Sequence, residues 1–144
     1  MPGLLAEGKY EEAAESVELG LGPEIFHGRV AHTFGALPSQ ECQLKGPVLV
    51  LPDLAGGAVV TTNFDRIVER VFAEAGSPFE HVAWGAQIDS IREAIAANKP
   101  FLLKIHGDAE ERSSRVLTKS EHDRHYAPNA PTPSCPTWPP RSTT

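Results

Sequence analysis

The hydrophobic pattern between residues 58 and 105 alternates between the period of a strand and the period of a helix. Strands are predicted at residues 58–62, 81–84 and 101–105, with helices between them at residues 67–75 and 88–95. The first strand is a β-branched apolar run entered through two glycines, as is typical of a strand buried on both faces. Parallel strands need a crossover connection, and this connection is usually a helix. The alternation therefore predicts an α/β fold with a parallel sheet.

The flanking segments add helices on both sides of this unit. Apolar residues at helical spacing predict helices over residues 10–21 and about 24–34, and the apolar run at residues 48–51 fits either a strand or a helical turn. After the third strand, residues 115–117 are predicted to form a last short strand. Thr118 and Glu121 then have the spacing of a capping box, which predicts a helix to about residue 126.

Length and charge limit the classes of protein that the chain can belong to. Its 144 residues are enough for one domain, and 13 basic against 19 acidic residues give a net charge of −6. This acidic balance disfavours nucleic acid as a partner, because binding to a phosphate backbone requires clustered positive charge. No stretch approaches the roughly 18 apolar residues of a membrane span, and the first residues do not resemble a signal peptide. Two cysteines far apart, Cys42 and Cys135, indicate a reducing, cytoplasmic compartment.

Proline marks a boundary near residue 126. Six of the 13 prolines fall in the last 18 residues. Such a segment favours extended conformations without a core of its own. We therefore expect a folded unit over residues 1–126 and a disordered, proline-rich tail over residues 127–144, either as a plain tail or as a ligand for a proline-binding module.

Polar side chains follow two of the predicted strands at the point where each strand ends. Asn63 and Asp65 follow the first strand, and His106 and Asp108 follow the third. In an open parallel sheet, ligands bind at the carboxyl edge, so these residues form a candidate site for a sugar or nucleotide. The alternative is structural, because Asn63 and Asp65 are also good helix caps and His106 also suits a bond to a loop carbonyl.

Two short blocks carry a resemblance to a known family. Residues 59–66 read Val-Val-Thr-Thr-Asn-Phe-Asp-Arg, residues 104–108 read Lys-Ile-His-Gly-Asp, and Val-Leu-Thr follows at residues 116–118. This order resembles the bacterial sirtuin-like domain family, in which the blocks are similar to the Thr-Gln-Asn-Ile-Asp and Leu-His-Gly motifs of sirtuin deacylases. The resemblance implies a Rossmann-like, NAD-binding parallel sheet.

The resemblance also implies an activity and roles for individual residues. The NAD-hydrolysing branch of the family, whose members often act in antiphage defence, cleaves the bond between nicotinamide and ribose. By position, Asn63 would hold the ribose and the attacking water, His106 would be the general base, and Thr62 and Asp65 would help to form the NAD pocket. No metal is implied, and His122 and His125 are read as exposed histidines rather than as metal ligands.

The sequence departs from the family at several points. Sirtuin deacylases carry a zinc ribbon with four cysteines, and this chain has two, so protein deacylation is the weakest of the functional hypotheses. The Gly-Ala-Gly-x-Ser phosphate turn does not occur in residues 1–10, and the proline-rich tail replaces the family's C-terminal part. We therefore expect a domain that lacks its first strand and C-terminal part. The alternative function is a catalytically inactive module that binds a nucleotide, a partner chain or a second copy.

Overall fold

The computed structural model describes residues 2–84 and 89–126, within which short helices surround a small sheet. The N-terminal half contains α1 (Pro2–Ala6), α2 (Tyr10–Leu21), α3 (Pro23–Phe34), α4 (Ala36–Glu41), the 3-10 helix η1 (Gly46–Val50) and α5 (Leu51–Leu54). The following elements are β1 (Ala58–Thr61), α6 (Ile67–Glu74), β2 (His81–Trp84), α7 (Asp89–Ala96), β3 (Phe101–Lys104) and α8 (Lys119–Tyr126).

The sheet is parallel and has the strand order β1-β3-β2. β3 pairs with β1 on one side, where Val60 lies opposite Leu103, and with β2 on the other, where Ala83 lies opposite Leu103. The predicted α/β fold with a parallel, Rossmann-like sheet is confirmed. β1 has a strand partner on one side only within the described residues, and the Val60 side chain is 59% exposed there.

The main hydrophobic core lies between the sheet and α6. Val68, Val71 and Phe72 of α6 are buried together with Leu102 of β3. These α6 residues recur at three- and four-residue spacing, so they form one apolar stripe along the helix. Because Leu102 lies on the central strand, the stripe covers the middle of the sheet.

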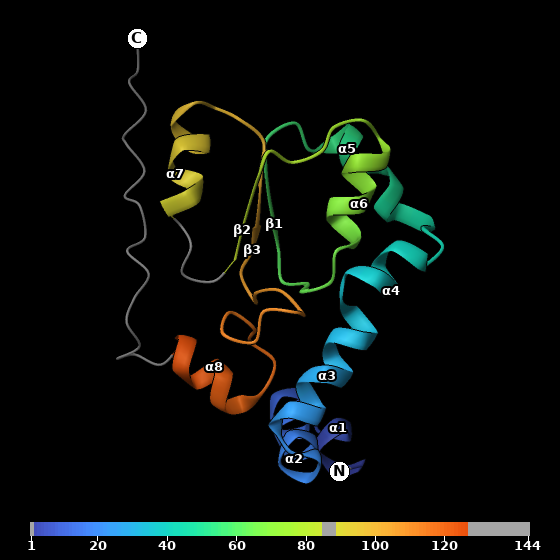
Figure 1. Ribbon diagram of the computed structural model, residues 1–144, viewed down its shortest axis with the longest axis vertical. Helices are drawn as coiled ribbons and strands as arrows, with labels where there is room; N and C mark the ends of the chain where they lie inside the picture. Colours follow the sequence, from blue (N-terminus) through green and yellow to red (C-terminus); the bar gives the residue numbers. More distant parts are fainter. Residues whose placement is uncertain (1, 85–88, 127–144) are drawn as a thin grey trace.

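A second core cluster joins the N-terminal helices to the loop that follows β3. Phe26 and Val30 of α3 are buried against Ala109, and Phe64 and Leu117 pack at the margin of this cluster. The carboxyl ends of the strands point toward α2, α3 and α8, which occupy the lower half of the view in Figure 1. α2 and α3 therefore face the edge of the sheet at which a ligand site is expected.

The structure decides between the two alternatives for residues 48–51, and it contradicts the strand predicted at residues 115–117. Residues 48–51, which fitted a strand or a helical turn, lie in η1 and the start of α5. The predicted strand at residues 115–117 is irregular chain. Val116 N donates one bond to His106 O (2.9 Å), but Arg115 N donates to Glu111 O (3.2 Å) and Leu117 N to Glu121 Oε2 (2.9 Å), so no ladder continues from it.

The predicted capping box at the start of α8 is confirmed. Thr118 N donates to Glu121 Oε2 (3.0 Å), and Glu121 N donates to Thr118 Oγ1 (3.3 Å). These reciprocal bonds satisfy donors that a helix start leaves without partners. They fix the position of α8 next to the loop that follows β3.

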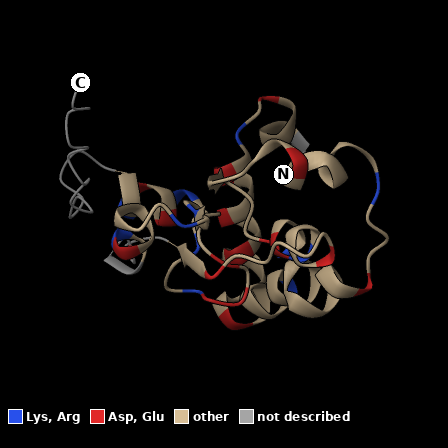
Figure 2. Cartoon of the chain, turned by 90° about the horizontal axis from the view of Figure 1, so that it is seen from above, with Lys and Arg blue, Asp and Glu red and all other residues tan. Residues whose placement is uncertain are grey.

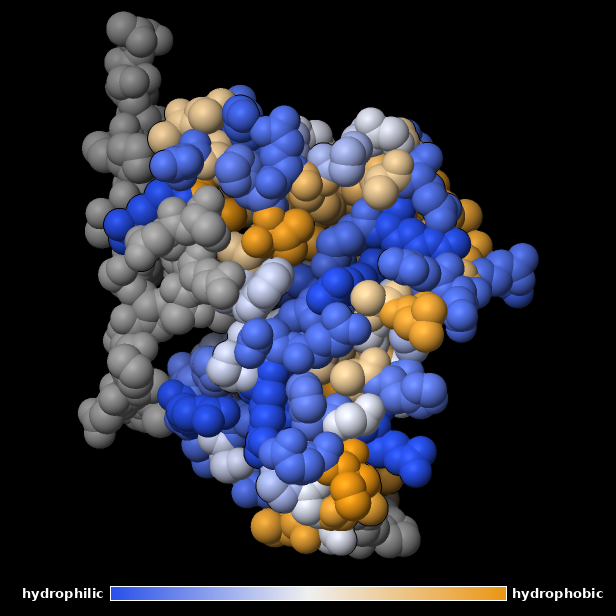
Figure 3. All heavy atoms as spheres, viewed as in Figure 1, coloured by the Kyte–Doolittle hydropathy of each residue, from blue (hydrophilic) through white to orange (hydrophobic). Residues whose placement is uncertain are grey.

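The surface mixes charges and exposes apolar side chains at the N-terminal helices. Basic residues are interspersed among acidic ones over the helices (Figure 2). Figure 3 shows hydrophobic side chains at the lower end of the view, where α1 to α3 lie, and the exposed residues there include Leu5, Leu19 and Ile25. Among the described residues, no helix is long and apolar enough to cross a membrane. The proline-rich segment 127–144 lies outside the described residues, so the division at residue 126 stays a prediction.

Candidate functional site

The two blocks at the strand ends lie side by side and are bonded to one another. Ile105 N donates to Thr61 O (3.0 Å), which extends the pairing of β1 and β3 beyond the strands. Farther along, Ala109 N donates to Phe64 O (2.9 Å). The loops that carry Asn63 and His106 are thereby held together over several residues, so the predicted juxtaposition of the two strand ends is present.

The residues that follow β1 divide into exposed and structural positions. Thr62 and Asn63 are exposed, and Asn63 N donates to Thr61 Oγ1 (3.0 Å). Asp65 Oδ1 accepts a bond from Ile67 N (3.0 Å), so Asp65 supports the first turn of α6. Because Arg66 occupies the N-cap position of α6, the bond of Asp65 is an Asx turn one residue before the cap and not the predicted N-cap itself.

His106 lines a small pocket at the carboxyl edge of the sheet. The pocket has a volume of about 150 Å³ and is lined by Tyr10, Glu11, Phe64, His106, Val116, Leu117 and His122. Thr62, Asn63 and Asp65 are absent from this lining. The structure therefore places His106 in a cavity with Phe64 of the first block, and it leaves the polar side chains of that block outside.

The electrostatic surroundings of His106 favour the neutral imidazole. Its pKa lies below the ordinary value of 6.5, chiefly because burial penalises the charged ring and secondly because His122 is close, while Glu11 acts in the opposite direction. A neutral imidazole near pH 7 has a lone pair available and can accept a proton. His106 thus has the ionisation state that a general base requires.

A buried lysine links the two blocks. The Lys104 side chain is 0% exposed, and its Nζ donates to Asp65 O (2.7 Å) and to Phe64 O (3.4 Å). The same Nζ forms ion pairs with Glu69 (3.0 Å) and Asp108 (3.0 Å). One ammonium group at the end of β3 therefore holds the chain on either side of Asp65.

Asp108 forms the other half of this network. Its two carboxylate oxygens accept bonds from Arg66 Nη2 (3.3 Å) and Nε (3.2 Å), and Oδ1 also accepts a bond from Glu110 N (3.0 Å). Burial by itself raises the pKa of this carboxyl group, but the bonds from Arg66, Glu110 and Lys104 outweigh it, so the pKa is lowered. Asp108 is a buried carboxylate with a structural role.

A second buried ion pair anchors α8 beside the site. Arg115 Nη2 contacts Glu121 Oε1 (2.9 Å), and Glu121 Oε2 accepts bonds from the backbone N–H of Leu117 (2.9 Å) and Thr118 (3.0 Å). Arg115 also lies 5.3 Å from the ring centre of Phe26 in α3. The pair therefore ties α8, the loop before it and α3 into one unit.

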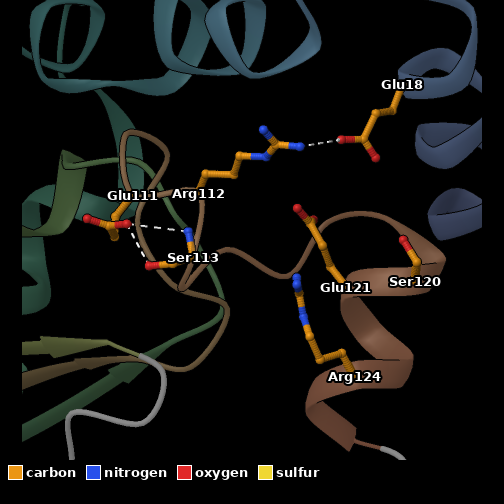
Figure 4. A pocket seen from close by; sticks show the side chains of 7 residues that line it. All are labelled: Glu18, Glu111, Arg112, Ser113, Ser120, Glu121 and Arg124. Carbon is orange, nitrogen blue, oxygen red and sulfur yellow. Dashed lines mark hydrogen bonds and ion pairs between the residues drawn. The ribbon is translucent and has the colours of Figure 1, made fainter. Parts of the chain in front are cut away.

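A larger pocket lies elsewhere and contains none of the predicted site residues. It has a volume of about 520 Å³ and is lined by Glu18, Glu111, Arg112, Ser113, Ser120, Glu121 and Arg124 (Figure 4). Arg112 reaches across it toward Glu18 (3.8 Å) and also pairs with Glu24 (2.8 Å). Glu111 bonds to Ser113 within the loop, and Glu121 pairs with Arg115 outside the lining. The two pairs of Arg112 join the loop at residues 111–113 to α2 and α3.

No cluster of three or more potential metal ligands is present within residues 2–84 and 89–126. His122 and His125 both lie on α8, and the ring of Tyr126 contacts both (4.8 and 6.5 Å between ring centres). Burial is the main reason that the pKa of His125 is lowered.

Comparison with known families identifies the region that carries the two blocks. A family model described as SIR2-like domain matches residues 57–136, more than half of the chain. The chain belongs to the SIR2-like domain family. A search of curated proteins found no match.

The SIR2-like segment includes both blocks, but it does not include the whole pocket. Phe64, His106 and His122 lie inside the matched residues, whereas Tyr10 and Glu11 of α2 lie outside them. The pocket is therefore built where the SIR2-like segment meets the N-terminal helices. Sequence reasoning did not identify Glu11 as a residue of this site.

Proposed function

We propose that this SIR2-like chain hydrolyses NAD to nicotinamide and ADP-ribose. The observation that carries the proposal is the position of His106, which follows β3 and lines a pocket beside the block that follows β1. Membership of the SIR2-like domain family supports NAD, or a related dinucleotide, as the ligand. Thr62, Asn63 and Asp65 are proposed to contribute to the NAD site.

The proposed step breaks the bond between the nicotinamide nitrogen and the ribose. Nicotinamide leaves as a neutral molecule with the bonding electron pair, because its ring nitrogen is positively charged in NAD. A water oxygen bonds to the ribose carbon, and the neutral His106 imidazole accepts a proton from this water. The exposed Asn63 amide is proposed to orient the ribose and the water, so catalysis would depend on positioning as well as on proton transfer.

The size of the pocket limits what it can enclose. Pockets for small molecules usually have volumes of about 300–1,000 Å³. The His106 pocket, at about 150 Å³, suits one ring of a dinucleotide, so the remainder of NAD would lie along the exposed edge near Thr62 and Asn63. In this arrangement, the residues of the His106 pocket would enclose one ring of NAD, and Thr62 and Asn63 would contact the rest of the molecule at the surface.

One observation favours a second candidate, a non-catalytic module that binds a nucleotide or a partner chain. Asn63 is exposed and does not line the pocket of His106. In such a module, the two blocks would hold a ligand without the alignment that hydrolysis requires. Measured turnover of NAD discriminates between the two candidates.

We expect His106→Ala to reduce nicotinamide release from NAD by about 10²- to 10⁴-fold, because the variant loses its proton acceptor. Asn63→Ala is expected to reduce the rate as well, through loss of positioning. The control is His32→Ala, which removes an exposed histidine of α3 and should leave the rate unchanged. Circular dichroism checks that all four proteins have the same helix content. Equal rates in the wild type and in His106→Ala would refute the assignment, and a folded wild type without turnover would favour the binding module.

A further inference from the structure

Two helices from opposite ends of the described chain bring ionisable side chains to the pocket of His106. Glu11 belongs to the first turn of α2, and His122 belongs to α8. Both side chains line the same cavity of about 150 Å³ as His106. The imidazole of His106 therefore faces a carboxylate on one helix and a second imidazole on another.

α8 is attached to the strand end that carries His106. Tyr126 Oη donates to Ile105 O (3.3 Å), the carbonyl that immediately precedes His106. The ring of Tyr126 also lies 4.8 Å from the ring of His122 and 6.1 Å from the ring of His106, measured between ring centres. Tyr126 thus contacts both histidines and holds α8 against the loop.

α2 and α8 are in turn held to one another. Ser120 N, at the start of α8, donates to Glu15 Oε2 of α2 (3.0 Å). Glu11 lies one helical turn before Glu15, so this bond fixes the part of α2 that faces the pocket. The helix pair therefore holds Glu11 and His122 in a defined relation to His106.

We propose that Glu11 and His122 are positioning residues for His106, and that together they set the pH range in which this imidazole accepts a proton. The inference rests on the proposed function in one respect: the proton that His106 accepts is taken to come from the water that attacks the ribose of NAD. Neither side chain is assigned to the reacting atoms. Their action on His106 is through charge and packing.

The two side chains act on the charge of His106 in opposite directions. Three ionisable groups line the pocket with His106: Tyr10 and Glu11 from α2 and His122 from α8. Tyr126 of α8 contacts the ring of His106. The apolar part of the lining comes from Phe64, Val116 and Leu117. Burial is the largest cause of the lowered pKa of His106, His122 lowers it further, and Glu11 raises it. Removal of His122 therefore favours the imidazolium of His106, and removal of Glu11 disfavours it.

Titration of the His106 ring by NMR, in the full chain, tests this inference without requiring turnover. We expect the titration midpoint of His106 to move to higher pH in His122→Gln and to lower pH in Glu11→Gln. The matched controls are His32→Gln on α3 and Glu41→Gln on α4, which make the same chemical changes at exposed positions. Neither control should move the midpoint.

The opposite signs separate a charge effect from a general loss of structure, since a loosened pocket would move both variants in the same direction. Unchanged midpoints, or shifts of the same sign, would overturn the proposal. In a chain that hydrolyses NAD, the acidic limb of the pH–rate profile should shift with each midpoint. Shifts of opposite sign in a chain without turnover would reject NAD hydrolysis and retain the coupling of the three residues.

Discussion

Replacement of Lys104 by methionine should destabilise the protein by about 3–5 kcal/mol, because it removes a buried cation and leaves the buried Asp108 carboxylate with Arg66 as its remaining charged partner. Lys104 is fully buried and pairs with Glu69 and with Asp108, which is itself 3% exposed. Methionine fills a similar volume but cannot donate to either carboxylate or to the carbonyl of Asp65. A loss of this size is a large share of the about 5–15 kcal/mol by which domains are usually stable. Urea denaturation followed by circular dichroism measures it.

The matched control for this substitution is Lys99→Met. Lys99 pairs with Glu80 at a similar distance (2.8 Å), but both side chains are exposed. Exposed pairs contribute little, because water screens the charges. We therefore expect no measurable change for Lys99→Met, and equal losses in the two variants would show that the buried network does not stabilise the fold.

Replacement of Gly107 by alanine should destabilise the protein by about 3 kcal/mol. Gly107 has a φ of +81°, in the left-handed region that alanine enters at a cost of about 1–2 kcal/mol. A Cβ atom at this position would also collide with the backbone of Ser114 and would lie 2.8 Å from Arg115 N. Because these neighbours are backbone atoms beside a buried ion pair, they cannot move without cost, and overpacking of this kind costs about a further 1–3 kcal/mol.

Gly76→Ala isolates the backbone part of this effect. Gly76 has nearly the same φ, +77°, and, apart from its chain neighbours, no heavy atom of the described residues lies within 4 Å of the added Cβ. The difference in unfolding free energy between the two variants therefore measures the collision at Gly107. If both variants lose the same stability, the close approach of residues 107 and 114 does not matter for the fold.

The fold was predictable wherever the local pattern and the tertiary environment agree. The alternation over residues 58–105 predicted β1, α6, β2, α7 and β3 correctly as elements. The burial of β1 on both faces was wrong, because β1 lies at an edge of the described sheet and Val60 is 59% exposed. The prediction of a short strand at residues 115–117 was wrong, because Arg115 N bonds to Glu111 O and Leu117 N bonds to the Glu121 carboxylate, contacts that the local pattern does not reveal. The helices α1 and α4 were not predicted, and each has only five or six residues, too few for a periodic pattern.

The site was predictable in part for the same reason. The two blocks were expected to lie together because parallel strands bring their carboxyl ends to one edge, and the structure shows them side by side; the roles of His106 and Asn63 stay predictions. Glu11 was not found, because nothing local to α2 shows that this helix packs near His106. The role of Lys104 had a visible signal, since a lysine that ends an apolar buried strand requires a partner, but the partners Glu69 and Asp108 emerge only from the packing of α6 against the loop after β3.

The central claim is that the two strand-end blocks form one NAD site, and amide chemical-shift mapping of the isotope-labelled chain with NAD tests it most directly. The account predicts perturbations at residues 61–66 and 104–108 together, with further changes at Tyr10 and Glu11 of α2. Residues around Arg112 and Arg124, which line the larger pocket, should be unaffected and serve as an internal control. Perturbations confined to that larger pocket, or none at millimolar NAD, would contradict the account.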